Sequence, residues 1–145
     1  MDKELVKHAI QLEGIAVKEL FIRVNSFGND TDKLERNYKL GVGHSEFDKD
    51  NSEIDVGILV KIGSPDHCLD DEKNSEIDLK VNLLAKFSVD QDRFPIQQID
   101  HWAENNAPLI LFPYLREHVY ALSIRAGIKP ILLPLMEVPV LSPNK

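Results

Sequence analysis

Two segments of the chain alternate apolar and polar side chains, and this pattern restricts both of them to β-strands. In residues 54–62 and 77–89 every second side chain is apolar. Successive side chains of a strand point to opposite faces of a sheet, whereas a helix needs apolar residues three and four positions apart. The alternating positions are Ile54, Val56, Ile58, Val60 and Ile62, then Ile77, Leu79, Val81, Leu83, Ala85, Phe87 and Val89. Each segment is therefore predicted to be a strand with one buried face.

Two earlier segments are also predicted to be strands. Apolar residues alternate from about Leu5 to Val24, with a slip of one residue near Glu19 that indicates a β-bulge. In residues 38–44 one face carries Tyr38, Leu40, Val42 and His44, whereas Gly41 and Gly43 leave the opposite face almost bare. Polar loops, including residues 25–32, separate the four strands. We expect them to form an antiparallel meander.

After Pro95 the spacing of apolar residues becomes helical. Residues 96–103 predict a short helix that Asn105 and Asn106 end. Residues 108–126 predict a longer helix, with Gly127 where helices commonly end. Pro113 is expected either to kink the first turns of this helix or to mark its true start. From Pro130 to Leu141 the prolines exclude both a continuous helix and an interior strand, so this apolar segment must lie extended against another surface.

The order of these elements predicts an α+β fold. All strands precede the helices, which gives a four-stranded antiparallel sheet followed by a short and a long helix in one domain, residues 1–145. Two helices cannot cover both faces and both edges of such a sheet, so we expect a dimer or a tetramer. The apolar stripe of the long helix is expected to be divided between core and subunit interface; its interface candidates are Leu111, Leu115, Val119 and Leu122.

Composition excludes several classes of protein. The formal net charge of −7 would repel nucleic acid and anionic membranes, which makes both poor candidate partners. The single cysteine, Cys68, cannot form an internal disulfide, as is typical of a reducing compartment. The charged start and the short apolar runs match neither a signal peptide nor a membrane span. We therefore expect a soluble cytoplasmic protein.

Chemical motifs are sparse, so we expect a binding protein and not an enzyme. The segment Asp66-His67-Cys68, with Asp70 and Asp71 nearby, lacks the paired ligands of a zinc site, and no metal or other cofactor is predicted. His101, His118 and Ser123 could be combined into a triad on paper, but Ser123 lacks the tight turn that exposes a nucleophile. His118 is interpreted as a surface or interface residue. Gly41-Val42-Gly43 lacks the third glycine of a dinucleotide fingerprint.

One segment carries a family resemblance. Residues 110–117, Ile-Leu-Phe-Pro-Tyr-Leu-Arg-Glu, open the predicted long helix. They resemble the signature of SecB, the bacterial protein-export chaperone family, in which Ile-Leu-Phe-Pro-Tyr, a small residue and Arg-Glu begin the first helix. The pattern of four upstream strands, a polar crossover and the proline-punctuated residues 130–134 is similar as well. The resemblance implies a SecB-like subunit in a dimer of dimers, a homotetramer that uses no cofactor and holds unfolded preproteins for export and translocation without ATP.

Such a chaperone needs apolar grooves of low specificity, because an unfolded client offers apolar side chains and unpaired backbone groups. The candidate client-binding residues come from the crossover, the second strand and the tail: Phe27, Leu34, Tyr38, Leu40, Val42, Ile131, Leu132, Leu135 and Met136. Each of them could instead be a core or subunit contact, because most regularly spaced apolar residues are packing residues.

Three positions on the sheet bear on whether this protein binds SecA. In the SecB family an acidic patch on the sheet receives the motor protein SecA. Glu19 keeps one of these positions and is the predicted SecA contact, whereas Arg23 and Lys80 replace carboxylates at two others. A SecB-like chaperone dedicated to one client, such as the antitoxin of a toxin–antitoxin system, would explain a kept fold with a changed SecA surface. A non-chaperone oligomeric adaptor that grips one folded partner is the alternative from another class.

Overall fold

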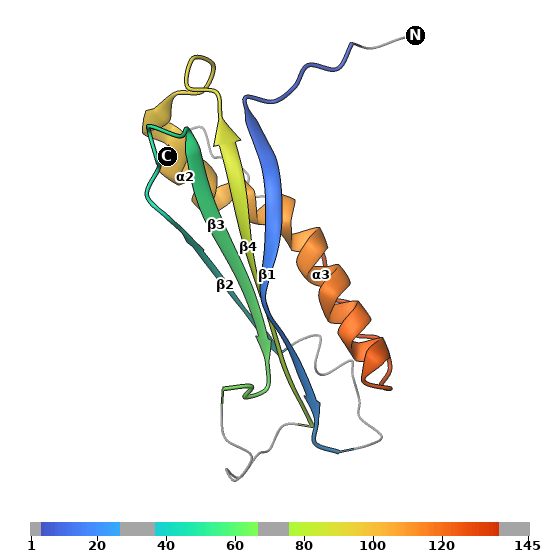
Figure 1. Ribbon diagram of the computed structural model, residues 1–145. Helices are drawn as coiled ribbons and strands as arrows, with labels where there is room; N and C mark the ends of the chain where they lie inside the picture. Colours follow the sequence, from blue (N-terminus) through green and yellow to red (C-terminus); the bar gives the residue numbers. More distant parts are fainter. Residues whose placement is uncertain (1–3, 27–36, 67–75, 137–145) are drawn as a thin grey trace, which may run out of the picture.

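The computed structural model describes residues 4–26, 37–66 and 76–136 and contains every strand and helix predicted above (Figure 1). The strands are β1 (Ile10–Val24), β2 (Tyr38–His44), β3 (Glu53–Ile62) and β4 (Ile77–Val89). A single 3-10 turn, η1 (Ile96–Gln98), leads into α2 (Ile99–Asn105), and the long helix α3 spans Ala107–Arg125. The α+β fold is confirmed. The first strand begins at Ile10 and not near Leu5, whose side chain is exposed.

The strands lie in the order β1-β4-β3-β2, so the predicted meander is wrong. Every neighbouring pair is antiparallel, but β1 pairs with β4 and lies on the opposite edge from β2. This arrangement is a Greek key. The segment between β1 and β2, residues 25–37, could span roughly 40 Å when extended, whereas three strand spacings need only about 15 Å. The connection is therefore long enough to join the two edges, and alternation within each strand does not specify its neighbours.

Strand β1 contains two irregularities in its pairing with β4. The register shifts between Val17 and Glu19, where the sequence predicts a bulge, and that prediction is confirmed. A second shift, which the sequence analysis missed, lies between Leu12 and Gly14. Each shift inserts an extra residue, so that core-facing positions of β1 keep matching core-facing positions of β4 along the long strand.

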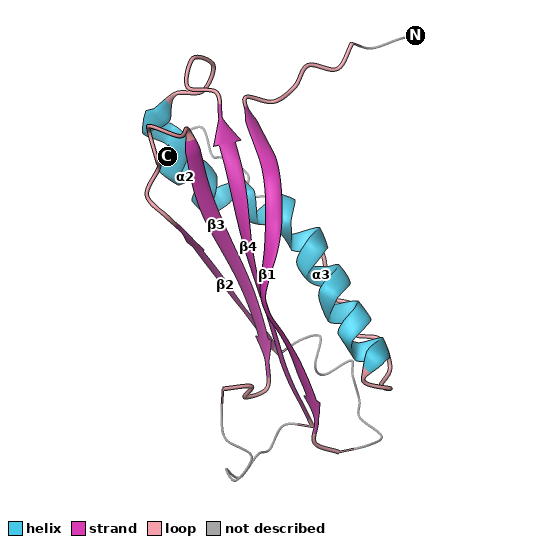
Figure 2. Cartoon of the chain, viewed as in Figure 1, coloured by secondary structure: helices cyan, strands magenta, loops and turns pink. Residues whose placement is uncertain are grey.

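One face of the sheet is covered by α2 and α3 (Figure 2), and the core lies between this face and the two helices. The alternating apolar positions of β3 and β4 are fully buried there. From α2, the ring of Trp102 packs edge-on against Phe87 at a centroid distance of 5.0 Å. From α3, a stripe of residues spaced by three and four faces the sheet; its buried apolar members include Leu111, Phe112, Leu115 and Val119.

The ends of α3 follow local rules. Pro113 lies inside the helix, which begins at Ala107, so this proline does not mark the helix start. At the other end Gly127 adopts φ = 79°, a conformation that glycine reaches without steric cost. The backbone N–H of Ile128 then donates to the carbonyl of Ser123, which closes the last turn. The chain thereby reverses its direction and returns along α3.

Candidate functional site

The predicted client-binding residues of β2 lie at the edge of the helix-covered face. Tyr38, Leu40 and Val42 pair with core-facing residues of β3, so their side chains point to the same face as the core. Because β2 is the edge strand, they are less covered: Tyr38 and Leu40 are half-buried, and Val42 is 43% exposed. Phe27 and Leu34, the two candidates from the crossover, lie outside the described residues. The structure thus brings together three of the five candidates from this part of the chain.

The four candidates from the tail differ in how far their side chains are buried. Leu132 and Leu135 are 53% and 79% exposed, and Met136 packs partly against the core. Ile131 is fully buried in the core, as is Leu133, which the sequence analysis did not select. An extended segment sends successive side chains to opposite sides, so one side of the tail is core and the other is surface. In this conformation Ile131 is not accessible to a client.

Two polar side chains of α3 hold the tail. The Oγ atom of Ser123 accepts a hydrogen bond from the backbone N–H of Ile131 at 2.9 Å, and its own hydroxyl lies within bonding distance of helix carbonyls at Val119 and Tyr120. Nε of Arg116 donates to the carbonyl oxygen of Leu133 at 2.8 Å. Arg116 belongs to the segment that resembles the SecB signature. Neither role was predicted from the sequence, although an extended segment without a neighbouring strand must find partners for its backbone groups.

The tail lies on one particular flank of α3. Leu20 of β1 lines a hollow of about 370 Å³ together with His118, Ala121 and Arg125 of the helix. Arg116 and Ser123 lie on the opposite flank, because the 100° advance per residue of an α-helix places them about half a turn away. The tail therefore packs on the side of α3 that faces away from β1.

The predicted interface residues of α3 are mostly core residues. Leu111, Leu115 and Val119 are fully buried within the single chain, and Leu122 is half-buried. The apolar residues that α3 exposes are different ones: Ile110, Tyr114, Tyr120 and Ile124. The sequence pattern could have shown them, because α3 is apolar on nearly all sides, and such a helix is normally buried on all sides.

Glu19 lies on the uncovered face of the sheet within a network of charges. Nζ of Lys80 lies 3.3 Å from a Glu19 carboxylate oxygen and 3.0 Å from Asp66, which Lys61 also contacts. The bonds from Lys61 and Lys80 hold the pKa of Asp66 below its usual value, and the bonds to Asp66 and Glu19 raise the pKa of Lys80. At the same end of the sheet Arg23 pairs with the buried carboxylate of Asp78 at 2.7 Å. The acidity expected of a SecA-binding surface is therefore neutralised here by cations.

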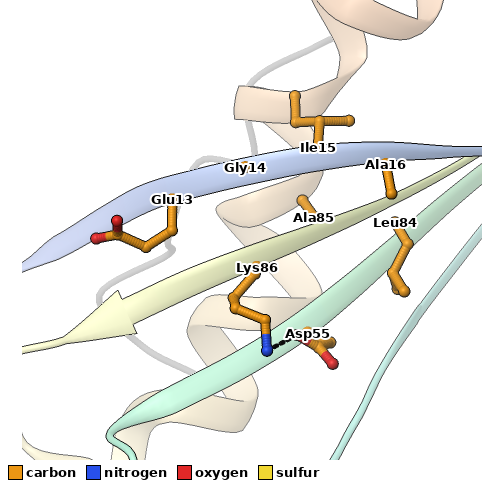
Figure 3. Close-up of a pocket in the computed structure, with 8 residues that line it drawn as sticks. All are labelled: Glu13, Gly14, Ile15, Ala16, Asp55, Leu84, Ala85 and Lys86. Carbon is orange, nitrogen blue, oxygen red and sulfur yellow. Dashed lines mark ion pairs between the residues drawn. The ribbon is translucent and has the colours of Figure 1, made fainter.

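The uncovered face also has a shallow apolar hollow of about 370 Å³ (Figure 3). Gly14, Ala16 and Leu84 form its floor, and a Cβ atom added at Gly14 would meet no atom within 4 Å. Lys86 and Asp55, whose charged atoms are 3.5 Å apart, stand at its rim. Short side chains at neighbouring positions therefore leave the sheet surface open, and its charged lining consists of this ion pair and Glu13, which accepts a hydrogen bond from Ser88.

His44, at the end of β2, joins the sheet to α2. Its Nδ1 lies 2.7 Å from the carbonyl oxygen of Ser45, and its Nε2 lies 3.3 Å from Oε1 of Glu104. The bond to Ser45, followed by the bond to Glu104 and the charge of Asp100, raises the pKa of His44. Both ring nitrogens face oxygen atoms that can only accept, so the protonated ring satisfies both contacts. We interpret the cluster as a structural link between β2 and α2.

The metal-ligand segment and the possible catalytic triad named from the sequence are the subject of few structural observations. Cys68, Asp70 and Asp71 lie outside the described residues, and in the remainder no three His, Cys, Asp or Glu side chains are placed to hold a metal ion. The hydroxyl of Ser123 is buried and bonded to backbone, and His118 lies 3.8 Å from the carboxylate of its neighbour Glu117. Within the described chain, no helix is both long and apolar enough to cross a membrane.

Both the sequence and the fold are similar to those of known proteins. No family model matches the sequence. The protein-export protein SecB of Saccharophagus degradans is 30% identical over an alignment that covers 44% of this chain and 47% of the relative, so the match spans about half of that protein. A SecB-like chaperone of Mycobacterium tuberculosis, solved in complex with a peptide from the HigA1 antitoxin, superposes with a TM-score of 0.66. That alignment covers 91% of this chain and 94% of the other, at 18% identity. The chain thus has the SecB-like fold, and part of its sequence is similar to SecB.

Proposed function

From this SecB-like fold, we propose that the protein is an ATP-independent chaperone that holds unfolded polypeptides. The observation that carries the proposal is the exposed side of the tail along α3. Leu132 and Tyr120 border an open hollow of about 310 Å³, and Leu135, three residues further along the tail, is exposed to solvent. Exposed, neighbouring apolar side chains of this kind are typical of interaction surfaces. Val42 adds exposed apolar surface at the β2 edge.

The proposal is tested by the aggregation of a denatured model protein such as citrate synthase during heating, followed by light scattering. We expect suppression at a near-stoichiometric amount of the chaperone with no nucleotide present. The double variant Leu132→Ser/Leu135→Ser should reduce this suppression, because it removes exposed apolar surface while leaving the buried Ile131 and Leu133 in place. Leu5→Ser, the same change at an exposed apolar residue outside the tail and α3, serves as control. Unchanged aggregation at equal subunit concentration would contradict the proposal.

Protein export from the cytoplasm is one setting for this activity, and it rests on the similarity to SecB of Saccharophagus degradans. A chaperone dedicated to an antitoxin is the second candidate, because the structural neighbour from Mycobacterium tuberculosis carries an antitoxin peptide. The pairing of Glu19 with Lys80 favours the second candidate, since it weakens an acidic docking surface for SecA. Capture from the native cell distinguishes them: export predicts many precursors, and dedication predicts one partner.

A non-chaperone adaptor remains the alternative from another class, in which the apolar tail grips one folded protein. Competition separates the two classes. Several unrelated denatured proteins should displace a labelled unfolded client from a holdase. If none of them does so while one folded partner binds tightly, the adaptor is supported and the holdase is contradicted.

We further propose that a second copy of the chain covers the outward side of α3. Ile110, Tyr114 and Ile124 expose apolar side chains along that helix, and the hollow beside His118 continues this surface to Leu20 of edge strand β1. An apolar helix side and an unpaired strand edge are both features that a single chain leaves unsatisfied. A dimer, or a tetramer built from two dimers, would cover them.

A further inference from the structure

The tail of this chain is bound in the way an extended peptide is bound. Residues 129–136 have no regular secondary structure, and Ile131 and Leu133 bury their side chains in the core while Leu132 between them is exposed. An extended segment that buries every second side chain presents its backbone groups between them. The two buried residues thus occupy neighbouring apolar sites along one flank of α3.

Side chains of α3, and not a neighbouring strand, recognise the backbone of this segment. Ser123 accepts from the N–H of Ile131 at 2.9 Å, and Arg116 donates to the carbonyl of Leu133 at 2.8 Å. Neither bond depends on the identity of residue 131 or 133, because both are made to main-chain atoms. Main-chain bonds combined with apolar pockets for alternate side chains are the usual basis of sequence-tolerant peptide recognition.

The tail also has an exposed flank from which another chain could enter. The hollow lined by Pro113, Arg116, Tyr120 and Leu132 is open and directly adjoins the Arg116 anchor. A second extended segment with apolar residues at positions i and i+2 could therefore make the same contacts that the tail now makes. Exchange of one segment for the other would leave the apolar surface buried and the Arg116 and Ser123 groups bonded.

We propose that this flank of α3 is a client-binding groove and that the chain's own tail, residues 129–136, occupies it until a client displaces it. The inference rests on the proposed holdase function and names its site. Residues Ile131 and Leu133 are then the intramolecular occupant of the groove and not part of its wall. The ligand is an extended, unfolded polypeptide segment with alternate apolar side chains.

Hydrogen exchange measured by mass spectrometry tests the proposal on the full chain. The probe is reduced, carboxymethylated α-lactalbumin, which stays unfolded, at saturating concentration. The amide of Ile131 is buried and bonded in the free protein, so we expect slow exchange there that accelerates when the client binds. Amides of β3 and β4 should not change. If the client binds and exchange of residues 131–133 stays the same or slows, the displacement is refuted while the holdase stands; if the client does not bind, the holdase proposal and this inference both fail.

A tail variant provides a second test. Leu133→Ala weakens the occupant but leaves Arg116 and Ser123 available to the client, so the Kd for carboxymethylated α-lactalbumin should fall by about tenfold. Leu5→Ala, the same change at an exposed position, should leave the Kd as it is. An unchanged or weaker affinity in a folded Leu133→Ala protein would argue against the tail as competitor. Should this variant unfold, the exchange measurement on the unaltered protein still decides.

Discussion

The guanidinium group of Arg23 lies 2.7 Å from the carboxylate of Asp78, and this ion pair links edge strand β1 to β4 at a position where Asp78 is completely buried. Asp78 also accepts hydrogen bonds from the Asn25 side chain and the backbone N–H of Ser64. Buried carboxylates need such partners, because removing a charge from water costs free energy that only ion pairs and hydrogen bonds can offset. The ion pair therefore joins the ends of β1 and β4, and the Ser64 bond ties the segment after β3 to the same carboxylate.

Replacing Arg23 with methionine should destabilise the protein by roughly 3 kcal/mol. The variant keeps an apolar stem at the position but leaves the carboxylate of Asp78 buried without its cation. Urea unfolding measures the free energy of unfolding. The matched control is Arg125→Met on the exposed side of α3, for which we expect a change within about 0.5 kcal/mol. Equal effects of the two substitutions would show that the Arg23–Asp78 pair contributes no more to the free energy of unfolding than an exposed arginine does.

Substitutions at Leu115 and Ile124 should separate folding from assembly. Leu115 is fully buried, so Leu115→Asp places an unpaired carboxylate in the core at a cost of several kcal/mol, comparable with the whole stability of a small domain. Ile124 is 51% exposed, so Ile124→Asp should fold normally but weaken self-association. Circular dichroism and sedimentation velocity measure the two properties. An Ile124→Asp protein of unchanged size would contradict the proposed covering of α3.

His44 should make stability depend on pH. Its pKa is raised in the folded protein, so its contribution is fully present below the unfolded value of about 6.5 and is lost as pH rises through the folded pKa. His44→Gln should therefore cost most stability at acidic pH, by no more than about 1 kcal/mol, as for a partly exposed ion pair. Urea unfolding at several pH values measures the difference. A difference that grows with rising pH would have the wrong sign.

Gly127→Ala should destabilise the end of α3 by about 1 kcal/mol. At φ = 79° the new side chain meets no atom within 4 Å, so the cost comes from the backbone conformation alone. Gly14→Ala is the comparison, because its added Cβ is equally unobstructed and its φ is not positive. We expect its free energy of unfolding to change by less than about 0.5 kcal/mol. Similar losses at both sites would refute the conformational explanation.

The candidate site was only partly predictable. Alternation places Tyr38, Leu40 and Val42 on one face of β2, and only the strand order shows that this face lies at the sheet edge; client binding by these residues stays a prediction. The tail was predicted to lie extended against another surface, and Ile131 does so, but as a buried residue. Arg116 and Ser123 could not be assigned their roles, because nothing in their local sequence indicates which distant backbone groups they bond.

The amino-acid sequence by itself determined the order and approximate positions of the strands and helices, which of their sides are apolar, and that Pro130 to Pro134 cannot be helical. These properties follow from side-chain spacing and from local backbone conformation, which neighbouring residues set among themselves. Only the tertiary structure decided that β1 pairs with β4, that Leu133 is core while Leu132 is surface, and that Lys80 neutralises Glu19. Those outcomes depend on which segments distant in sequence meet in space, and that is settled by the packing of the whole chain around a single core.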